Sequence, residues 1–340
     1  MKILVIRRDN IGDLVCTTPM FSALRQHYPD AHIAALVNSY NADVLAGNPD
    51  LDAVHVYTKA KHREAGQSVL GVYLDRLRLF RKLRAERFDH AIIAGAHFLP
   101  RALRLARLVA PRHIIGFTEP GKRGVQHIDM GIPYALPQPM HEVEDIFRLL
   151  GPLGIAGPPG PQVLISPAEE THKAEELANS MTGSLTVGLH ISARKPLQRW
   201  PKESFAELAR RLASRHDARM LLFWSPGSAN NPQHPGDDEK AAWIVENVKG
   251  LPLAPFPTRR LAELMGGLAA CDAVICSDGG AMHIAAGLGK PIVCFFGNSD
   301  ATRWHPWGVP YELLKKESRD VADITVEEAL AAFERLMARL

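Results

Sequence analysis

Short apolar runs alternate along the chain with longer amphipathic segments. The runs in the first half span residues 2–8, 32–38, 53–57, 90–95 and 113–117. Those in the second half span residues 185–191, 219–224, 272–277 and 291–296. Because these runs are nearly all apolar and do not alternate with polar residues, they predict parallel strands that helices cover on both faces.

Helical periodicity fills the intervals between the runs. Apolar side chains recur every three to four positions in the segments 19–28, 75–88, 101–109, 141–154, 202–216, 258–271 and 281–289. A last helix is expected over residues 326–340, packed on either half of the chain. The alternation stops at residues 151–162, GPLGIAGPPGPQ, whose glycines and prolines predict a domain boundary.

This pattern predicts an α/β protein with two Rossmann-like, doubly wound domains facing a cleft. We expect the first domain at residues 1–155, the second at 163–325 and a C-terminal helix at 326–340. Ligands of such folds bind at the carboxyl ends of the strands. The polar residues that follow the predicted strands are therefore the candidates for chemistry.

Composition narrows the class of protein. The 340 residues suffice for two cores, and 46% hydrophobic and 23% charged residues are ordinary for a globular chain. No apolar run approaches the ~20 residues that cross a bilayer, and the chain opens in a strand without a leader pattern. The four cysteines include no C-x-x-C pair and are expected to be reduced core thiols. These features predict a cytoplasmic protein.

Positive charge gathers in one part of a chain whose net charge is only +3. Residues 59–112 hold 13 basic and 4 acidic side chains. Two helices with solvated basic faces would account for this excess, and so would a surface for an anionic membrane leaflet or a phosphorylated acceptor. Nucleic acid is less favoured, because no nucleic-acid-binding motif accompanies the basic residues. The docking surface would consist of Arg76, Arg78, Arg81, Lys82, Arg84, Arg101 and Arg104.

Residues 7–15, RRDNIGDLV, follow the first strand with more polar side chains than a plain turn requires. Asp13 is either the N-cap of the next helix or a free carboxylate facing the cleft, where it can act as a general base. Thr18 and Pro19 provide a separate start signal for that helix. The residues supporting this loop would be Arg7, Asn10 and Gly12.

The strand that ends at His190 leads into a polar loop, and Trp200-Pro201 marks the start of the following helix. The three cations of the loop are either solvated charges or a binding site for an anion. The candidate residues in it are Ser192, Arg194, Lys195 and Arg199.

A third strand ends at Ser277-Asp278 and is followed by Gly279-Gly280 and a helix. Exposed amides at such a helix start bind phosphate, and glycines allow the close approach of the backbone. His283 lies within the first turn. Together with the cationic loop, this segment predicts a diphosphate site. It is neither a Walker loop nor G-x-G-x-x-G, so neither nucleotide hydrolysis nor NAD is indicated.

Three segments resemble glycosyltransferase family 9, the bacterial ADP-heptose:lipopolysaccharide heptosyltransferases. They are DNIGD with the following TTP, RWP, and SDGGAMHIAAGLGKPIVCFFG, and the resemblance spans residues 1 to about 310. It implies a GT-B fold and an inverting transfer that needs neither metal nor cofactor. It also implies a nucleotide-sugar donor, expected to be ADP-linked, on the second domain. The acceptor would be a lipid-linked glycan of the lipopolysaccharide core, reached by peripheral contact with the inner membrane.

The resemblance also assigns individual residues. The catalytic aspartate of the family falls on Asp13, and its donor motif falls on Asp278, Gly279, Gly280 and His283. Gly279 stands where the family usually has a hydroxyl residue, and Gln198 stands where members often carry a lysine that meets the diphosphate. We expect Arg199, or else Lys195, to replace that charge.

Other acidic residues are harder to assign. Asp237, Asp238 and Glu239 are candidate ribose or sugar contacts, and their spacing does not choose among them. Asp50-x-Asp52 resembles the metal-binding D-x-D of other glycosyltransferases, but its position before a first-domain strand favours turn chemistry.

In the expected mechanism, Asp13 takes the proton of an acceptor hydroxyl as that oxygen attacks the anomeric carbon in one inverting step. Amides and cations stabilise the departing diphosphate. Two other functions stay open at this point. One is a nucleotide-sugar-binding protein of the same fold without turnover, and the other is an epimerase or phosphorylase.

Overall fold

The structure is a computed structural model that describes residues 1–58, 69–135, 138–231 and 235–340. The chain forms two compact units, Met1–Ile165 and Ser166–Leu340. The division lies shortly beyond the glycine- and proline-rich segment 151–162. No helix within the described ranges is both long and apolar enough to cross a membrane.

The first unit is built on a parallel six-stranded sheet in the order β3-β2-β1-β4-β5-β6. Its strands are β1 (Lys2–Ile6), β2 (His32–Asn38), β3 (Ala53–Tyr57), β4 (His90–Ile93), β5 (His113–Thr118) and β6 (Met130–Pro133). Ile3, Leu4, Val5 and Ile6 of the central strand are completely buried, as the apolar run predicts. The sequence did not predict β6, because MGIP is short, lies at the sheet edge and is half exposed.

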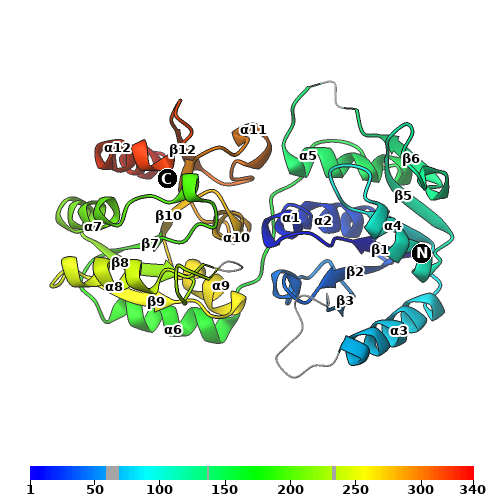
Figure 1. Ribbon diagram of the computed structural model, residues 1–340, viewed down its shortest axis with the longest axis horizontal. Coiled ribbons are helices and arrows are strands. Elements are labelled where there is room, and N and C mark those ends of the chain that lie inside the picture. The colour runs from blue at the N-terminus through cyan, green and yellow to red at the C-terminus, as the bar shows by residue number, and fades with distance from the viewer. Residues whose placement is uncertain (59–68, 136–137, 232–234) are drawn as a thin grey trace. The chain divides into compact units, whose positions relative to one another are not determined.

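Helices cover both faces of this sheet (Figure 1). They are α1 (Ile11–Val15), α2 (Thr18–His27), α3 (Val69–Ala85), α4 (Pro100–Val109) and α5 (Glu142–Phe147), with 3₁₀ turns η1 (Ala42–Leu45), η3 (Val125–His127) and η4 (Arg148–Leu153). Leu4 and Ile6 of β1 pack with apolar residues of α3 and α4, whereas α2 packs with α5. The residues after β1 form a short helix of their own, α1, which the sequence did not predict as separate from α2.

The second unit repeats this architecture with a parallel sheet in the order β12-β11-β10-β7-β8-β9. Its strands are β7 (Leu185–His190), β8 (Ala218–Trp224), β9 (Leu253–Pro257), β10 (Ala273–Ser277), β11 (Ile292–Phe296) and β12 (Tyr311–Lys315). The four central strands match the predicted runs. The edge strands β9 and β12 were missed, because two prolines interrupt β9 and charged residues end the apolar part of β12.

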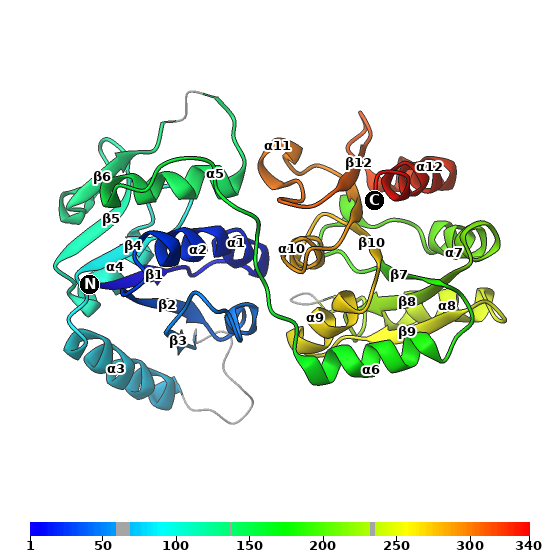
Figure 2. The ribbon, with the colours of Figure 1, turned by 180° about the vertical axis from the view of Figure 1, so that it is seen from behind.

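The helices of the second unit also form two layers (Figures 1 and 2). They are α6 (Ala168–Asn179), α7 (Lys202–His216), α8 (Asp238–Asn247), α9 (Leu261–Ala269), α10 (Gly280–Gly287), α11 (Ala301–Trp304) and α12 (Val326–Met337), with 3₁₀ turns η5 (Pro196–Gln198) and η6 (Val321–Asp323). One layer contains α7, α8 and α12, and the other contains α6, α9 and α10. The C-terminal helix therefore belongs to the second unit. The predicted start after Trp200-Pro201 is confirmed, because α7 begins at Lys202.

Each sheet has a point where the chain reverses its direction of winding. In the first unit β1 and β4 are neighbours, and their following segments lead to opposite sides. In the second unit the same holds for β7 and β10. Ligands of open α/β sheets bind at the carboxyl ends of such strand pairs. All three of the polar strand ends found in the sequence lie at these two switch points.

Candidate active site

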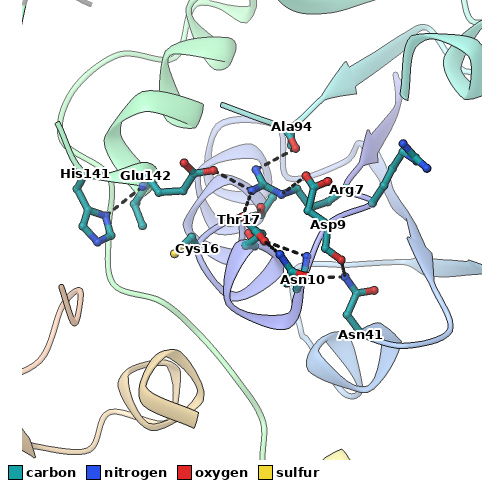
Figure 3. A network of polar contacts seen from close by, with 12 residues as sticks. Arg7, Asp9, Asn10, Cys16, Thr17, Asn41, Ala94, His141 and Glu142 are labelled. Atoms are coloured by element: carbon teal, nitrogen blue, oxygen red, sulfur yellow. Dashed lines mark hydrogen bonds and ion pairs between the residues drawn. The ribbon is translucent and has the colours of Figure 1, made fainter. Parts of the chain in front are cut away.

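Arg7 is the centre of the site in the first unit (Figure 3). It follows β1, and its side chain is only 2% exposed. Nη1 donates to the carbonyl of Ala94, which follows β4, at 3.0 Å. Nη2 donates to Asp13 Oδ1 and to Glu142 Oε1, both at 2.8 Å. One guanidinium thus joins the two strand ends of the switch point to α1 and α5.

Asp13 is held from two sides. Its Oδ2 accepts hydrogen bonds from the backbone nitrogen and from Nδ2 of Asn10, both at 2.9 Å, and its Oδ1 is paired with Arg7. Asn10 is the N-cap of α1, and Asp13 is the third residue of that helix. Asp13 is therefore not the N-cap of a helix, and its carboxylate is not free of partners. Both expectations about the contacts of this side chain were wrong. Gly12 lies buried within the same helical turn and is not a free hinge.

The electrostatics of this pair keep Asp13 ionised. Burial alone would raise the pKa of Asp13, but attraction to Arg7 and the hydrogen bonds from Asn10 outweigh burial and lower it below 3.8. Burial alone would likewise lower the pKa of Arg7, and its three carboxylate neighbours raise it instead. The Asp13 side chain keeps 15% exposure, so a ligand can reach it. An ionised, partly exposed carboxylate can accept a proton from a bound hydroxyl group.

Glu142 belongs to this site although the sequence did not single it out. It is fully buried at the first position of α5, where His141 caps the helix by accepting from Val143 N at 3.1 Å. Asp9 is the third acid, with Oδ2 lying 3.4 Å from Arg7 Nε. One positive charge therefore faces three carboxylates, and this negative excess favours a neutral hydroxyl over an anion beside Asp13.

Two buried asparagines hold the loop that carries these residues. Asn38 Nδ2 donates to the carbonyl of Arg8 at 3.0 Å, and Asn41 Nδ2 donates to the carbonyl of Asp9 at 3.3 Å. Both asparagines are fully buried, Asn38 as the last residue of β2 and Asn41 three positions further on. The backbone of the loop is therefore fixed by its neighbours before any ligand binds, which is the preorganisation that a catalytic carboxylate needs.

Gln198 lies at the switch point of the second unit, where it contacts the residue that follows β10. It is 5% exposed, and its Nε2 donates to Asp278 Oδ2 and to Ser299 Oγ, both at 2.7 Å. The amide thus orients Asp278, which follows β10. A buried neutral side chain tied to Asp278 brings no positive charge to a diphosphate, in contrast to the lysine that the family often has at this position.

The cationic loop, residues 191–201, contains the three expected positive charges. Arg199 lies across its own loop, with Nε donating to the carbonyl of Ala193 at 2.9 Å and Nη1 lying 3.9 Å from Asp237. Lys195 is exposed and has no ion pair within the described part of the chain. Arg199, the cation preferred from sequence, is therefore held by contacts within the second unit.

Two further features complete this site. Ser192 Oγ accepts from Ser225 N at 2.9 Å and so joins the loops after β7 and β8. Gly279 is the N-cap of α10, and a Cβ added there would meet no atom within 4 Å. The first amides of α10, beginning at Gly280, have no acceptor within the helix. His283 is buried one turn further on, edge-to-face with Trp304 at 5.9 Å between ring centres.

Asp237, Asp238 and Glu239, among which the sequence spacing did not choose, have different surroundings in the structure. Asp238 accepts from Trp224 Nε1 at 2.7 Å and from Gly227 N at 2.9 Å, so it shapes the loop after β8. Asp237 is buried beside Arg199. Glu239 is exposed, and no hydrogen bond or ion pair holds it in the part of the chain that the structure describes. Of the three acids, Glu239 is therefore the one that internal contacts leave unengaged among the described residues.

Asp50 and Asp52 have structural roles in the first unit. Asp50 accepts from Ser22 Oγ. Asp52 accepts from Arg25 Nη2 and from Ile33 N, both at 2.7 Å. Among the described residues, no group of three or more His, Cys, Asp or Glu side chains is arranged to hold a metal ion. Both carboxylates are thus engaged in contacts within the first unit.

The basic surface of the first unit lies on α3 and α4. Its exposed cations are Arg78, Arg81, Lys82, Arg84, Arg101 and Arg104, whereas Arg76 lies over the Tyr57 ring at 5.4 Å. Lys59, Lys61 and Arg63 of the basic stretch lie outside the described residues. Tyr73, Leu74 and Leu77 of α3 are exposed by 56%, 47% and 56%. A pocket of about 480 Å³ beside α4 is lined by Arg104, Arg107, Arg123 and His127, with no acidic residue among its walls.

Known proteins resemble the chain over its whole length. A model described as glycosyltransferase family 9 (heptosyltransferase) matches residues 76–330. Lipopolysaccharide heptosyltransferase 3 of Escherichia coli is 23% identical over 346 residues, with 96% of each chain covered. A family 9 glycosyl transferase of Veillonella parvula has a TM-score of 0.82 at 22% identity, covering 100% of this chain and 97% of that one. The E. coli heptosyltransferase WaaC with ADP has a TM-score of 0.78 at 19% identity, covering 99% and 100%. These two structures confirm the predicted fold class.

Proposed function

The chain belongs to glycosyltransferase family 9, the heptosyltransferase family, and on this premise we propose that it transfers heptose from ADP-heptose to a glycan acceptor of the lipopolysaccharide-core type. The observation that carries this proposal is the ionised, partly exposed Asp13, held by Arg7 and Asn10 at the switch point of the first unit. A curated relative over 96% of the chain is a lipopolysaccharide heptosyltransferase, and a solved structure of similar fold contains ADP.

In the proposed reaction, Asp13 acts as the general base. A carboxylate with a lowered pKa is a weak base toward a hydroxyl group that has not begun to react. The acidity of that hydroxyl rises as its oxygen bonds to the anomeric carbon, so the proton moves late in the step. The neighbouring acid Glu142 is fully buried and therefore cannot attack the sugar. A single displacement with inversion of the anomeric carbon is the outcome that this arrangement favours.

The second unit is proposed to bind the donor. The amides at the start of α10 and the exposed Lys195 would meet the diphosphate, and Asp278 would be oriented for the donor by Gln198. The open space at Gly279 lets the phosphate approach the backbone directly. Glu239 is the proposed contact for a ribose or sugar hydroxyl. These groups stabilise the charge of the leaving nucleoside diphosphate, and the reaction is proposed to need no metal ion.

The acceptor is proposed to be lipid-linked and anionic. Basic residues that form no ion pair with any described residue line the pocket beside α4, where a phosphate or carboxylate group of the glycan would be neutralised. The exposed tyrosine and leucines of α3 lie among arginines, which suits peripheral contact with an anionic membrane leaflet. We place the reaction on the cytoplasmic side of that membrane.

The proposal is tested by incubating the purified protein with ADP-heptose and a lipopolysaccharide-core acceptor that lacks the added sugar. Mass spectrometry of the acceptor should show the gain of one heptose, and NMR should show an inverted anomeric centre. UDP- and GDP-sugars, tested in parallel, determine the donor. Binding of ADP-heptose without transfer or hydrolysis would instead identify a nucleotide-sugar-binding protein.

A further inference from the structure

Lys240 joins the two ends of the cationic loop. It lies in the first turn of α8, and its Nζ donates to the carbonyl of Ile191 at 3.0 Å and to that of Trp200 at 2.7 Å. These two carbonyls stand at the beginning and near the end of residues 191–201. One ammonium group therefore links the two ends of the cationic loop, which contains Lys195.

An aromatic side chain covers part of this ammonium group. Its Nζ lies over the Phe205 ring, 4.9 Å from the ring centre. The Trp200 side chain beside it is fully buried, with Nε1 donating to the carbonyl of Ile324 at 2.8 Å. Removing an ammonium group from water costs free energy. A lysine that only joins two carbonyls would destabilise the fold by this cost, which suggests that its position or charge has a further use.

We infer that Lys240 is a positioning residue for the donor diphosphate: it fixes the cationic loop through Ile191 and Trp200, and its charge adds to the positive field there. This inference rests on the proposed function, because it takes the loop to be the phosphate site. Lys240 itself is not expected to touch the donor. Its nitrogen is already directed at two carbonyls of the loop backbone.

The charge state of Lys240 makes this role dependent on pH. Burial lowers the pKa of Lys240 to about 8, with attraction to Asp237 opposing this shift and repulsion by Arg199 adding to it. Among the described residues, Glu203 and His190 also interact electrostatically with it. Burial, together with Lys240, lowers the pKa of His190 to about 4, so His190 stays neutral near pH 8. Loss of the Lys240 proton therefore dominates the electrostatic change around pH 8.

Deprotonation acts on the loop and on the whole fold in opposite directions. A neutral amine donates weaker hydrogen bonds than an ammonium group, so both ties of the loop weaken above pH 8. The pKa of Lys240 is lower in the folded protein than the ordinary 10.5 of an unfolded chain. The unfolded state therefore binds more protons between pH 8 and 10.5, and this group makes unfolding less favourable as the pH rises. Above pH 8, donor affinity should therefore fall although deprotonation of Lys240 does not lower the free energy of unfolding.

The experiment measures ADP binding by calorimetry between pH 7.5 and 9.5. We expect the wild-type protein to lose roughly tenfold in affinity across this range, the usual effect of weakening one charge-assisted contact. Lys240→Arg keeps its charge and should show no such loss. Lys240→Met should bind weakly at every pH. Lys249→Met is the matched control, because Lys249 is exposed and paired with Glu246 at 2.7 Å, and it should follow the wild type.

Hydrogen exchange of residues 191–200 supplies a readout that does not depend on nucleotide binding. Exchange should be faster in Lys240→Met than in the wild type at an unchanged Tm. Wild-type affinity and wild-type exchange in Lys240→Met would overturn the inference. If the wild-type protein does not bind ADP while exchange still rises in Lys240→Met, the loop-positioning role stands and the donor assignment of the proposed function fails.

Discussion

Gln198 Nε2 lies 2.7 Å from Asp278 Oδ2, so one neutral side chain joins the cationic loop to the end of β10. Gln198→Ala would leave the Asp278 carboxylate without this donor while removing no charge. We expect the KM for the nucleotide sugar to rise about tenfold, the usual cost of losing a hydrogen bond to a charged group. Steady-state kinetics with Leu197→Ala as control checks this, because Leu197 is exposed in the same 3₁₀ turn. An equal rise in both variants would show that the turn, and not the Asp278 contact, matters.

Asp13→Asn should separate binding from turnover. The amide has the shape of the carboxylate and can still meet Arg7, but it cannot accept a proton from the acceptor. We expect kcat to fall by ~10²–10⁴-fold, the usual contribution of a general base, with donor affinity nearly unchanged. Single-turnover assays and calorimetry with ADP measure the two quantities. Near-wild-type turnover would leave Asp13 as a helix-capping residue only.

Glu142→Gln tests how the charge of Glu142 affects the basicity of Asp13, since Arg7 contacts both carboxylates. Arg7 Nη2 donates to Glu142 and Asp13 at the same distance of 2.8 Å. Without the Glu142 charge, the repulsion between the two carboxylates is lost while Arg7 still attracts Asp13, so the pKa of Asp13 falls further and Asp13 becomes a weaker base. We expect kcat to fall about threefold to tenfold, following Brønsted behaviour.

The pH profile gives a second readout for this pair of residues. Because the pKa of Asp13 lies below 3.8, protonation of Asp13 should not reduce wild-type kcat between pH 7 and 5. Any acid limb that Asp13 causes should lie lower still in Glu142→Gln. A wild-type rate that falls with a midpoint near pH 6 would contradict an Asp13 base held by Arg7.

The central parts of both sheets could be predicted from sequence, because buried strands leave continuous apolar runs. The edge strands β6, β9 and β12 could not, since one of their sides faces solvent and their sequences mix polar residues with proline. The helices α6 and α8 were missed as well, as were the short helices α1 and α11. In α6 the buried residues are Glu170, Ala174 and Ala178, which give little apolar periodicity, and α8 follows a long polar loop.

The site was predictable only where chemistry follows a strand directly. Asp13 and Asp278 stand out because polar residues interrupt the pattern at a strand end. Their partners do not stand out: Glu142 is 135 positions from Arg7, and Lys240 is 49 positions from Ile191. Such pairs are made by the packing of α5 and α8, and a single sequence contains no local signal for it. Arg199 was preferred over Lys195 for the same reason, since its contact with Asp237 depends on α8.

Removal of divalent metal should not abolish transfer. The amides of α10 and Lys195 are proposed to neutralise the diphosphate, and both Asp50 and Asp52 are engaged in structural contacts. We expect kcat within about twofold of the untreated enzyme after dialysis against EDTA, because a metal ion that stabilised the leaving group would contribute several kcal/mol. Asp50→Asn serves as a second check and should also retain activity. Loss of activity in EDTA with recovery on adding Mg²⁺ or Mn²⁺ would require a metal site.

The last prediction concerns the basic surface on α3 and α4. Each Lys or Arg near an anionic leaflet contributes roughly 1 kcal/mol, and salt screens this attraction. Exposed Leu74 and Leu77 add apolar area between these charges, as in helices that lie in a membrane interface. We therefore expect the protein to sediment with anionic vesicles at low salt, less at high salt, and not with neutral vesicles.

Charge reversal locates this binding on α3. Arg81 and Arg84 are exposed and have no ion pair within the described residues, so Arg81→Glu/Arg84→Glu disrupts no internal contact. The double variant should lose at least tenfold in affinity for anionic vesicles, because two attractive charges become repulsive. The control is Arg215→Glu, an equally exposed position on α7 of the second unit. Because transfer to a soluble, lipid-free acceptor does not require the membrane, its rate should be unchanged in both variants. Equal binding to anionic and neutral vesicles, or no loss in the double variant, would reduce these arginines to an ordinary solvated helix face.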